Sequence, residues 1–312
     1  MKKLIAVPCF NEEENINQCL DSLIKLRQLR EIDFDILVVN DGSKDQTANK
    51  LKEYKSIISI LSSNRNFGLS EVFNSIMEYS RNQNYDALII FDSDNQYPSV
   101  DIPELFNELS SKDNDIVIGS RDVPALKHFS LSKKFFQKLG SFIVSLSLRL
   151  SLTDVTSGFR AYSNKAINLL FVSNTFTYTL ETLYQAKRNK LKISNYDISH
   201  TNETRESRLF DSNLEYISKS IKVIFKSLLI YRSKLVMTFS ILIFSIPGLV
   251  LTSRFFIKYL QNGSNPGNIQ SLIVGLGYLN FLLIFLIFLY FVLNNFKNKV
   301  FFMKTLYKPK HN

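Results

Sequence analysis

The sequence predicts an α/β domain, in which helices cover both faces of a mostly parallel sheet, followed by a transmembrane helical hairpin. Two observations support this fold class. Over residues 1–120, short apolar runs rich in β-branched residues alternate with amphipathic stretches, a pattern typical of parallel strands joined by crossover helices. Near the C-terminus, residues 235–253 and 259–296 contain no charged side chain, and each segment is long enough to cross a bilayer as a helix.

Five apolar runs within the first 120 residues are the expected strands. In chain order they are KLIAVP (3–8), FDILVVN (34–40), ISILSS (58–63), DALIIFD (86–92) and NDIVIGS (114–120). Between them, apolar residues recur at helical spacing, for instance in residues 11–27 and 69–81. We expect the α/β domain to cover residues 1–210.

The rest of the chain is expected to form three further parts. Residues 211–233 are predicted to be an amphipathic juxtamembrane helix, and residues 234–296 to hold two membrane helices at about 235–253 and 269–293. Residues 297–312 form a basic tail.

The charge distribution separates the two predicted halves. The 312-residue chain carries a formal net charge of +10, but residues 216–312 contain twelve Lys or Arg and no acid, whereas residues 1–215 hold 26 basic and 28 acidic residues. This confinement argues against nucleic acid as a partner and favours an anionic membrane surface. The only two cysteines, Cys9 and Cys19, are too few for a zinc cluster or a disulfide framework.

Basic residues also predict the orientation in the membrane. They cluster before the first hydrophobic segment and after the second, whereas the intervening loop carries only Arg254 and Lys258. By the positive-inside rule, we expect a multi-pass protein of the cell (inner) membrane with the α/β domain and both termini in the cytosol.

Two stretches outside the spans have the character of membrane-surface helices. Residues 214–234 place apolar side chains at helical spacing and lysines on the remaining face, as in helices that lie in the headgroup region. Residues 123–153 also contain basic residues and no acid. For the run SFIVSLSLRLSL within them, a membrane-surface helix and a packed core helix are equal alternatives.

Polar residues follow each of the five expected strands. They are PCFNEEE (8–14), NDGS (40–43), NRNFGLS (64–70), DSDNQ (92–96) and GSRD (119–122). Turn chemistry accounts for one or two such endings, but ligands of open α/β sheets bind beyond the carboxyl ends of the strands. Five endings at one edge therefore predict a ligand site.

Asp92 and Asp94 are the most specific pair at this edge. Two carboxylates at a strand end can hold a hard divalent cation such as Mg²⁺ or Mn²⁺ and leave room for water and phosphate. No GxxxxGK[ST] or GxGxxG motif is present. A diphosphate ligand is therefore expected to be bound through a metal and arginines.

The ordered motifs resemble family 2 glycosyltransferases with the nucleotide-diphospho-sugar transferase (GT-A) fold, from residue 3 to about residue 210. The motifs that carry the resemblance are VPCFNEEENI, VVNDGSKDQT, NRNFGLS, FDSDNQYP, GSR, TDVTSGFRAY and TRESRL. The branch that looks most similar is the polyprenyl- and dolichol-phosphate sugar synthases with two C-terminal membrane helices. The sequence departs from the family pattern at Asn40, where NDG replaces the usual DDG. It also lacks Trp, so the QxxRW signature of processive polysaccharide synthases is missing.

The resemblance implies roles for particular residues. Those implied to bind the nucleotide sugar are Pro8, Phe10, Glu12, Asp41, Asn66, Asp92 and Arg121. Those implied to bind the metal are Asp92, Asp94 and Gln96. Those implied to contact the acceptor are Ser157, Arg160, Arg205, Lys133 and Lys134. Those implied to act in catalysis are Asp94, Asp154 and Arg205.

The implied reaction is inverting transfer of one hexose-type sugar from a UDP- or GDP-sugar to a polyprenyl phosphate, undecaprenyl or dolichyl, at the cytosolic membrane face. The implied cofactor is Mg²⁺ or Mn²⁺. The implied assembly is a homo-oligomer such as the tetramer that similar two-span proteins can form. The alternative expectation is a membrane-anchored family 2 glycosyltransferase that acts on a saccharide or glycolipid.

Overall fold

A computed structural model describes residues 1–29, 32–125, 131–201, 213–262 and 266–306. The chain divides into two units, Met1–Ile224 and Phe225–Asn312. The division falls inside helix α8 (Asn213–Tyr231), and the domain boundaries drawn from the sequence stay predictions.

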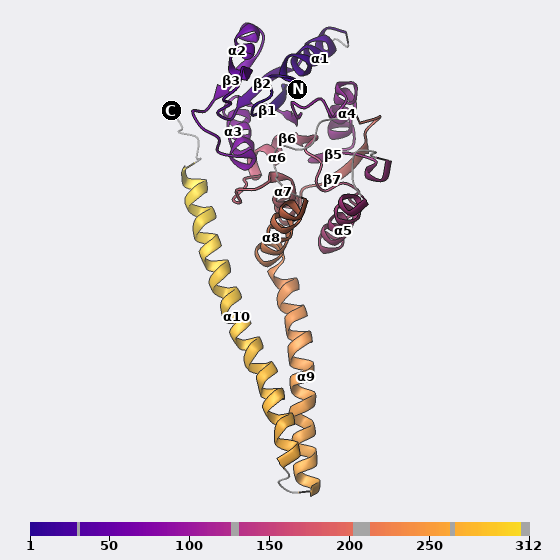
Figure 1. The fold of residues 1–312 in the computed structure, drawn as a ribbon, viewed down its shortest axis with the longest axis vertical. Coiled ribbons are helices and arrows are strands. Elements are labelled where there is room, and N and C mark those ends of the chain that lie inside the picture. Colours follow the sequence, from indigo (N-terminus) through magenta and orange to yellow (C-terminus); the bar gives the residue numbers. More distant parts are fainter. Residues whose placement is uncertain (30–31, 126–130, 202–212, 263–265, 307–312) are drawn as a thin grey trace. The chain divides into compact units, whose positions relative to one another are not determined.

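The first unit contains one seven-stranded sheet (Figure 1). Its strands, in spatial order, are β3 (Ser59–Ser62), β2 (Asp35–Asn40), β1 (Lys3–Cys9), β4 (Ala87–Ile90), β6 (Arg160–Ser163), β5 (Ile116–Ser120) and β7 (Ile193–Asp197). Within the part of the chain that the structure describes, β6 alone runs against its neighbours β4 and β5, and the other pairings are parallel. The five predicted strands are present, and the sheet is mostly parallel, as the sequence predicts.

Reversal of β6 has a consequence for the site. Because β6 is antiparallel, the chain enters it at the edge where β1, β2, β4 and β5 end. The loop before β6, residues 150–159, therefore joins the polar endings of the parallel strands.

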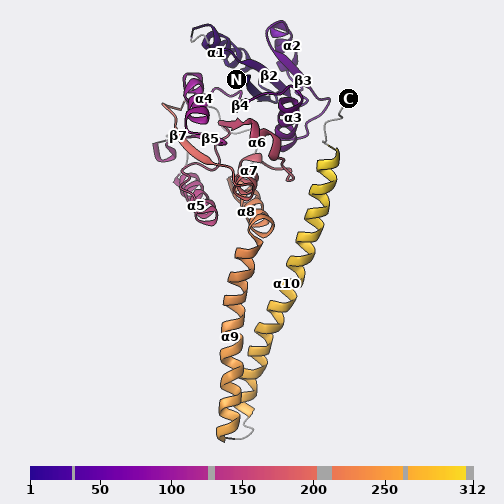
Figure 2. The same ribbon diagram turned by 180° about the vertical axis from the view of Figure 1, so that it is seen from behind.

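Helices cover both faces of the sheet (Figures 1 and 2). Helices α1 (Ile16–Leu29) and α4 (Ile102–Ser111) bury apolar residues in one core with side chains from β1, β2 and β4. Helix α3 (Leu69–Asn82) packs with α6 (Asn164–Leu169) and α7 (Tyr178–Arg188) on the other face. There the ring of Phe73 stacks on Tyr178 at 4.7 Å and meets Tyr162 edge-on at 5.9 Å.

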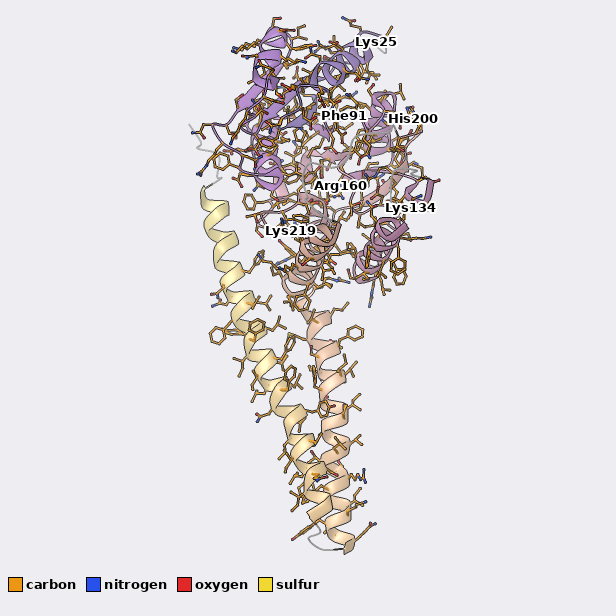
Figure 3. All side chains as sticks on the ribbon, in the orientation of Figure 1. Lys25, Phe91, Lys134, Arg160, His200 and Lys219 are labelled. Atoms are coloured by element: carbon orange, nitrogen blue, oxygen red, sulfur yellow. The ribbon has the colours of Figure 1, made fainter. Side chains whose placement is uncertain are left out.

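The remaining elements of the first unit are four short helices and the longer helix α5. They are α2 (Thr47–Leu51), η1 (Lys52–Tyr54), η2 (Ser99–Asp101), η3 (Val123–Ala125) and α5 (Leu131–Leu148). Figure 3 shows Phe91 and Arg160 inside this unit and Lys25 and Lys134 toward its outside.

The second unit holds two long helices, α9 (Ser233–Asn262) and α10 (Pro266–Leu306). Residues Ser233–Gln261 and Ile269–Phe296 are long and apolar enough to cross a membrane. Helix α9 includes residues 235–253 and α10 includes residues 269–293, the two segments predicted to span the membrane. Thus two helices of membrane-spanning character are present, as expected, while the exact lipid boundaries and the orientation remain predictions.

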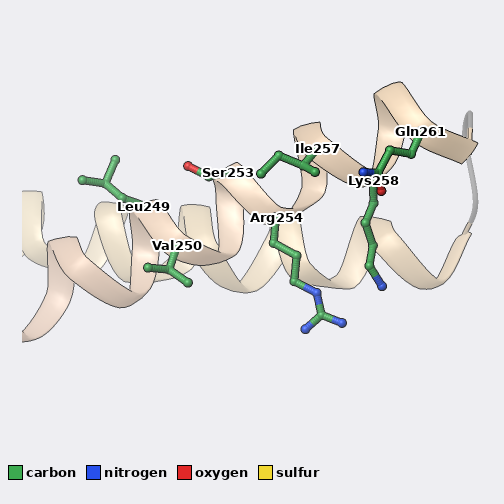
Figure 4. A pocket seen from close by; sticks show the side chains of 7 residues that line it. All are labelled: Leu249, Val250, Ser253, Arg254, Ile257, Lys258 and Gln261. Atoms are coloured by element: carbon green, nitrogen blue, oxygen red, sulfur yellow. The ribbon is translucent and has the colours of Figure 1, made fainter.

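Small residues allow α9 and α10 to approach closely. A Cβ atom added at Gly275 would lie 2.6 Å from Thr252 Oγ1 and 2.9 Å from the Gly248 carbonyl oxygen, so only glycine fits there. Such crossings are typical of helices that pack in lipid. A hollow on α9 contains none of the residues predicted for the site (Figure 4). Its lining side chains are Leu249, Val250, Ser253, Arg254, Ile257, Lys258 and Gln261.

Candidate active site

The loops after β1 and β2 are joined by hydrogen bonds between side chains and backbone. The Asn11 amide donates to Ser43 Oγ at 2.9 Å, and the Lys44 amide donates to Asn11 Oδ1 at 2.8 Å. The Glu12 amide donates to Thr47 Oγ1 at 2.8 Å. Asn11 has φ 54, a left-handed conformation that Asn tolerates better than most residues. The polar residues of NEEE and DGS thus hold two loops of the site in a fixed arrangement.

Asp41 fixes the third loop. Its side chain is 5% exposed, and it accepts from the Phe67 amide at 2.9 Å and from the Gly68 amide at 2.8 Å. Gly42 has φ +70, and an added Cβ would lie 2.4 Å from the Arg65 carbonyl carbon. Asp41 and Gly42 therefore fix the conformation of the NRNFG loop. Asn66, within this loop, is exposed to solvent.

Asp92 and Asp94 lie in the turn after β4. Asp92 is half-buried and its carboxylate packs against the backbone of Gly158, because a Cβ added there would be 2.7 Å from Asp92 Oδ2. Burial and repulsion from Asp94 raise the pKa of Asp92 to about 7, although Arg121 opposes the shift. Asp94 Oδ1 accepts from the Gln96 amide at 3.0 Å, which closes the turn. Two like charges are thus held close together at the end of a central strand.

Arg121, in the turn after β5, forms a buried ion pair with Asp154 from the loop before β6. Its Nε donates to Asp154 Oδ2 at 2.7 Å, and its Nη2 donates to Oδ1 at 3.2 Å. Nη1 donates to Gln96 Oε1 at 3.2 Å. Burial alone raises the pKa of Asp154, but the charge of Arg121 and hydrogen bonds from Arg121 and Thr156 outweigh it, so the net pKa lies below the ordinary value. Arg121 therefore connects the acidic turn after β4 to the loop before β6.

Arg160 and Ser157 lie behind this cluster and support it. Arg160 is fully buried, and its guanidinium donates to the carbonyl oxygens of Val155, Ser157 and Thr179 at 2.7–2.8 Å. Ser157 is also fully buried and donates to the Gly119 carbonyl oxygen at 2.6 Å. A direct contact of either side chain with an acceptor would require these bonds to break. In this structure both side chains thus hold the loop before β6, and their contact with an acceptor stays a prediction.

The other predicted residues differ in how far the structure describes them. Pro8 is buried at the end of β1, and Phe10 and Glu12 are half-buried beyond it. Lys134 lies on α5, where its Nζ donates to the Pro124 carbonyl oxygen at 2.7 Å. The Lys133 side chain and the whole of Arg205 lie outside the described residues.

Several residues of the site are not evident from sequence. Thr156 Oγ1 donates to Asp154 Oδ1 at 2.8 Å and accepts from Gln137 Nε2 at 2.7 Å. Tyr97 Oη accepts from the Gly158 amide at 3.3 Å and lies 3.2 Å from Ser157 Oγ. Tyr97 directly follows the acidic turn, and Thr156 lies within DVTSGF. Proximity to these motifs is the one feature of the sequence that could have indicated that the two residues belong to the site. The partnership with Gln137 depends on tertiary structure.

The acidic turn suits Mg²⁺ or Mn²⁺ only together with a phosphate ligand. Among the described residues, no group of three or more His, Cys, Asp or Glu side chains is arranged to hold a metal. Asp92 and Asp94 supply two carboxylates, and Gln96 offers an amide oxygen that already accepts from Arg121. Mg²⁺ is commonly bound by one or two carboxylates plus substrate phosphates, and a cation would offset the repulsion that raises the pKa of Asp92. The residues present therefore fit such a metal.

A mostly parallel sheet with a reversed β6 and an acidic turn after β4 defines a GT-A-like α/β fold. Residues 4–171 match the glycosyl transferase family 2 domain, which is more than half of the chain. The chain belongs to glycosyl transferase family 2.

Named relatives come from both bacteria and archaea. The undecaprenyl-phosphate mannosyltransferase of Micrococcus luteus is 30% identical over 169 residues, which are 52% of this chain and 66% of that protein. The UDP-N-acetylglucosamine–dolichyl-phosphate N-acetylglucosaminyltransferase of Methanococcus voltae is 27% identical over 214 residues, which are 62% of this chain and 83% of that protein. The chain thus spans just under two thirds of the mannosyltransferase.

A solved structure supports the fold. Glucosyl-3-phosphoglycerate synthase from Mycobacterium tuberculosis, in complex with Mn²⁺, uridine diphosphate and phosphoglyceric acid, superposes with a TM-score of 0.56 at 17% identity, covering 73% of this chain and 77% of that one. At this level of identity the similarity shows the GT-A-like fold alone.

Proposed function

We propose that this chain transfers a single hexose-type sugar from a UDP- or GDP-sugar to a polyprenyl phosphate, with inversion at the anomeric carbon. The observation that carries the proposal is the acidic turn at Asp92 and Asp94, joined to the buried Arg121–Asp154 pair, in a chain with two helices of membrane-spanning character. The names of two family relatives, which act on undecaprenyl and dolichyl phosphate, support the choice of acceptor.

A phosphate acceptor agrees with the side chains at the site. A sugar hydroxyl needs a base to remove its proton, whereas a phosphate monoester with a second pKa near ~6 is already an anionic nucleophile at neutral pH. His200 is the one histidine among the described residues, and it is exposed and paired with Ser199 beyond β7. The described part of the site therefore offers arginine and carboxylates and no histidine base.

The chain's own residues have four tasks in this reaction. Mg²⁺ or Mn²⁺ held by Asp92 and Asp94, with Gln96 as a further ligand, would neutralise charge on the leaving diphosphate. Asp41 holds the loop of Asn66 beside the pocket that we assign to the nucleoside, with Pro8, Phe10 and Glu12 lining it. Asp154 fixes the guanidinium of Arg121 so that its positive charge stays near the phosphates. Lys133, Lys134 and Arg205 are proposed to meet the acceptor phosphate.

The membrane placement belongs to the same proposal. We place the first unit and both chain ends in the cytosol at the cell membrane, where a polyprenyl phosphate headgroup is accessible. Clusters of basic residues before α9 and within α10 support this orientation.

Product analysis tests the proposal. The full chain in lipid nanodiscs is incubated with Mg²⁺ or Mn²⁺, radiolabelled UDP- and GDP-sugars, and undecaprenyl or dolichyl phosphate. We expect label in the organic phase that mild acid releases, together with release of a nucleoside diphosphate. Pyrophosphate release would instead identify a nucleotidyltransferase. Label in an aqueous glycan or a glycolipid, with none on lipid phosphate, would identify the saccharide or glycolipid acceptor.

A further inference from the structure

Asn95 lies in the acidic turn, between the proposed metal ligands Asp94 and Gln96. Its φ of 59 places it in the left-handed region, which Asn adopts more readily than most residues apart from glycine. Across it, Asp94 Oδ1 accepts from the Gln96 amide at 3.0 Å, as in an Asx turn. The backbone conformation of residue 95 therefore determines how the two ligands lie relative to each other.

The side chain of Asn95 ties this turn to helix α1. Its Nδ2 donates to the Asn15 carbonyl oxygen at 3.2 Å and to Gln18 Oε1 at 3.4 Å. The two segments meet because β1 and β4 are adjacent parallel strands, so the start of α1 and the turn after β4 lie at the same edge of the sheet. Asn95 is half-buried, so water competes only in part for these hydrogen bonds.

Asn15 extends this connection to Glu12. Asn15 Nδ2 donates to Glu12 Oε2 at 3.1 Å, and the Asn15 amide donates to the Glu12 carbonyl oxygen at 3.0 Å. The Glu12 amide donates in turn to Thr47 Oγ1, in the first residue of α2. A continuous path of hydrogen bonds therefore joins the acidic turn to the loop that we assign to the nucleoside.

We propose that Asn95 is a positioning residue, whose side-chain amide holds the acidic turn in its metal-binding conformation through α1. The inference rests on the proposed function, which assigns Mg²⁺ or Mn²⁺ to Asp92 and Asp94. Two neighbouring carboxylates repel each other, so the turn that carries them needs other contacts to stay closed. The Asn95 amide supplies such a contact before the metal and the nucleotide bind, and binding then does not have to order the turn.

Three variants separate the side-chain amide from the backbone conformation. Asn95→Gly removes the amide and keeps a residue that adopts positive φ readily. Asn95→Ala removes the amide and also disfavours the left-handed conformation. Asn84→Gly is the matched control, because Asn84 has φ 55 and is exposed before β4, at the opposite edge of the sheet.

Binding of Mn²⁺ without any acceptor tests the inference in the absence of turnover. The full chain is placed in nanodiscs of neutral lipid, since anionic lipid would itself bind Mn²⁺, and UDP or GDP is added. The electron paramagnetic resonance signal of free Mn²⁺ then gives the bound fraction. We expect about tenfold weaker binding in Asn95→Gly, still weaker binding in Asn95→Ala, and wild-type binding in Asn84→Gly.

Kinetics provide a second readout that a purely structural role would not change. The Mn²⁺ concentration that gives half-maximal sugar transfer should rise about tenfold in Asn95→Gly. The kcat at saturating Mn²⁺ should stay within about twofold of wild type, because the lost contact acts on binding and not on the chemical step.

The outcomes distinguish this inference from the proposed function. Wild-type Mn²⁺ affinity in Asn95→Gly, even with a lower Tm, would overturn the positioning role and leave the metal site intact. An equal loss of affinity in Asn84→Gly would also overturn it. If wild type binds no Mn²⁺, or if Asp94→Ala binds it as tightly as wild type, the proposed metal site is wrong and the role of Asn95 fails with it. If Asn95→Ala does not fold, Asn95→Gly and its control still decide the question.

Discussion

Arg121 and Arg160 mark two regions at the carboxyl edge of the sheet that differ in what surrounds the positive charge. Arg121 pairs with the carboxylate of Asp154 and reaches Gln96 in the acidic turn. Arg160 donates to three backbone carbonyls and to Thr182 Oγ1, and it is fully buried. The first region places charges next to a ligand site, whereas the second uses a charge to hold a loop. Substitutions in the region of the acidic turn should therefore affect mainly activity, and substitutions at Arg160 should affect mainly stability.

Arg160→Met should have the largest effect on stability. It removes the donor of the buried Val155 and Ser157 carbonyls. The Thr179 carbonyl, in contrast, keeps the hydroxyl of Thr182 as a donor. Each unsatisfied acceptor costs up to about 3 kcal/mol, so we expect about 4–6 kcal/mol in total. For a unit of this size that corresponds to a Tm lower by roughly 10–20 °C. Thermal unfolding of the detergent-solubilised chain measures it. A Tm within about 2 °C of wild type would contradict a supporting role for Arg160.

Asp154→Asn should rank next, because it leaves the Arg121 charge buried without its carboxylate. Loss of one partner of a buried pair costs about 3–5 kcal/mol. The folded-state pKa of Asp154 lies below its unfolded value, so the stabilisation is fully present above the unfolded pKa near ~3.9 and is lost as pH falls through the folded pKa.

The Tm difference between wild type and Asp154→Asn should therefore be full at neutral pH and shrink in acid. Thermal unfolding over a pH series from neutral to strongly acid measures it, with Asp113→Asn as the control. Asp113 forms an exposed ion pair with Lys192, and its loss should leave the Tm unchanged. A constant difference for Asp154→Asn at every pH would show that the ion pair is not its source.

Asp94→Ala should affect turnover and leave stability nearly intact. Loss of one group that stabilises developing charge typically lowers kcat by about 10²–10³. The lost bond from the Gln96 amide is offset by relief of the repulsion on Asp92. Sugar transfer and Tm measured on the same preparation separate the two effects. Wild-type turnover in this variant would remove Asp94 from the proposed metal site.

The sequence predicts these two regions to different degrees. The five strands before residue 121 can be predicted because each is a local apolar run. The position of Asp92, Asp94 and Arg121 at one site can be predicted because parallel strands end at the same edge of the sheet. Strands β6 and β7 were not predicted, since Arg160–Ser163 is too short for a clear pattern. The burial of Arg160 depends on Thr179, which is nineteen residues away in sequence. No local pattern could distinguish a loop-holding arginine from a ligand-binding one.

Gly158→Ala should have an intermediate effect, because Gly158 lies where the two regions meet. An added Cβ would be 2.7 Å from Asp92 Oδ2 and 3.1 Å from Tyr178 Oη. Overpacking of this kind typically lowers the free energy of unfolding by about 1–3 kcal/mol. Displacement of the Asp92 carboxylate should also lower turnover by about ten- to a hundredfold. Steady-state kinetics with titrated Mg²⁺ should show a higher metal requirement. An unchanged requirement would mean that Asp92 has not moved.

Gly140→Ala is the control for Gly158→Ala. We expect it to have the smallest effect on stability, and to raise the Tm where Gly158→Ala lowers it. Gly140 lies inside helix α5, and a Cβ added there meets nothing within 4 Å. Glycine inside a helix is less stable than alanine by roughly 0.5–1 kcal/mol, so the substitution should raise the Tm by about 1–4 °C. Turnover should stay at the wild-type level, because no described contact of the site involves this position. If Gly140→Ala lowers the Tm, α5 packs more tightly than its open surroundings indicate. If it lowers turnover while the Tm rises, the rigidity of α5 matters to the Gln137–Thr156 contact, and the catalytic region extends beyond Arg121 and Asp154 into this helix.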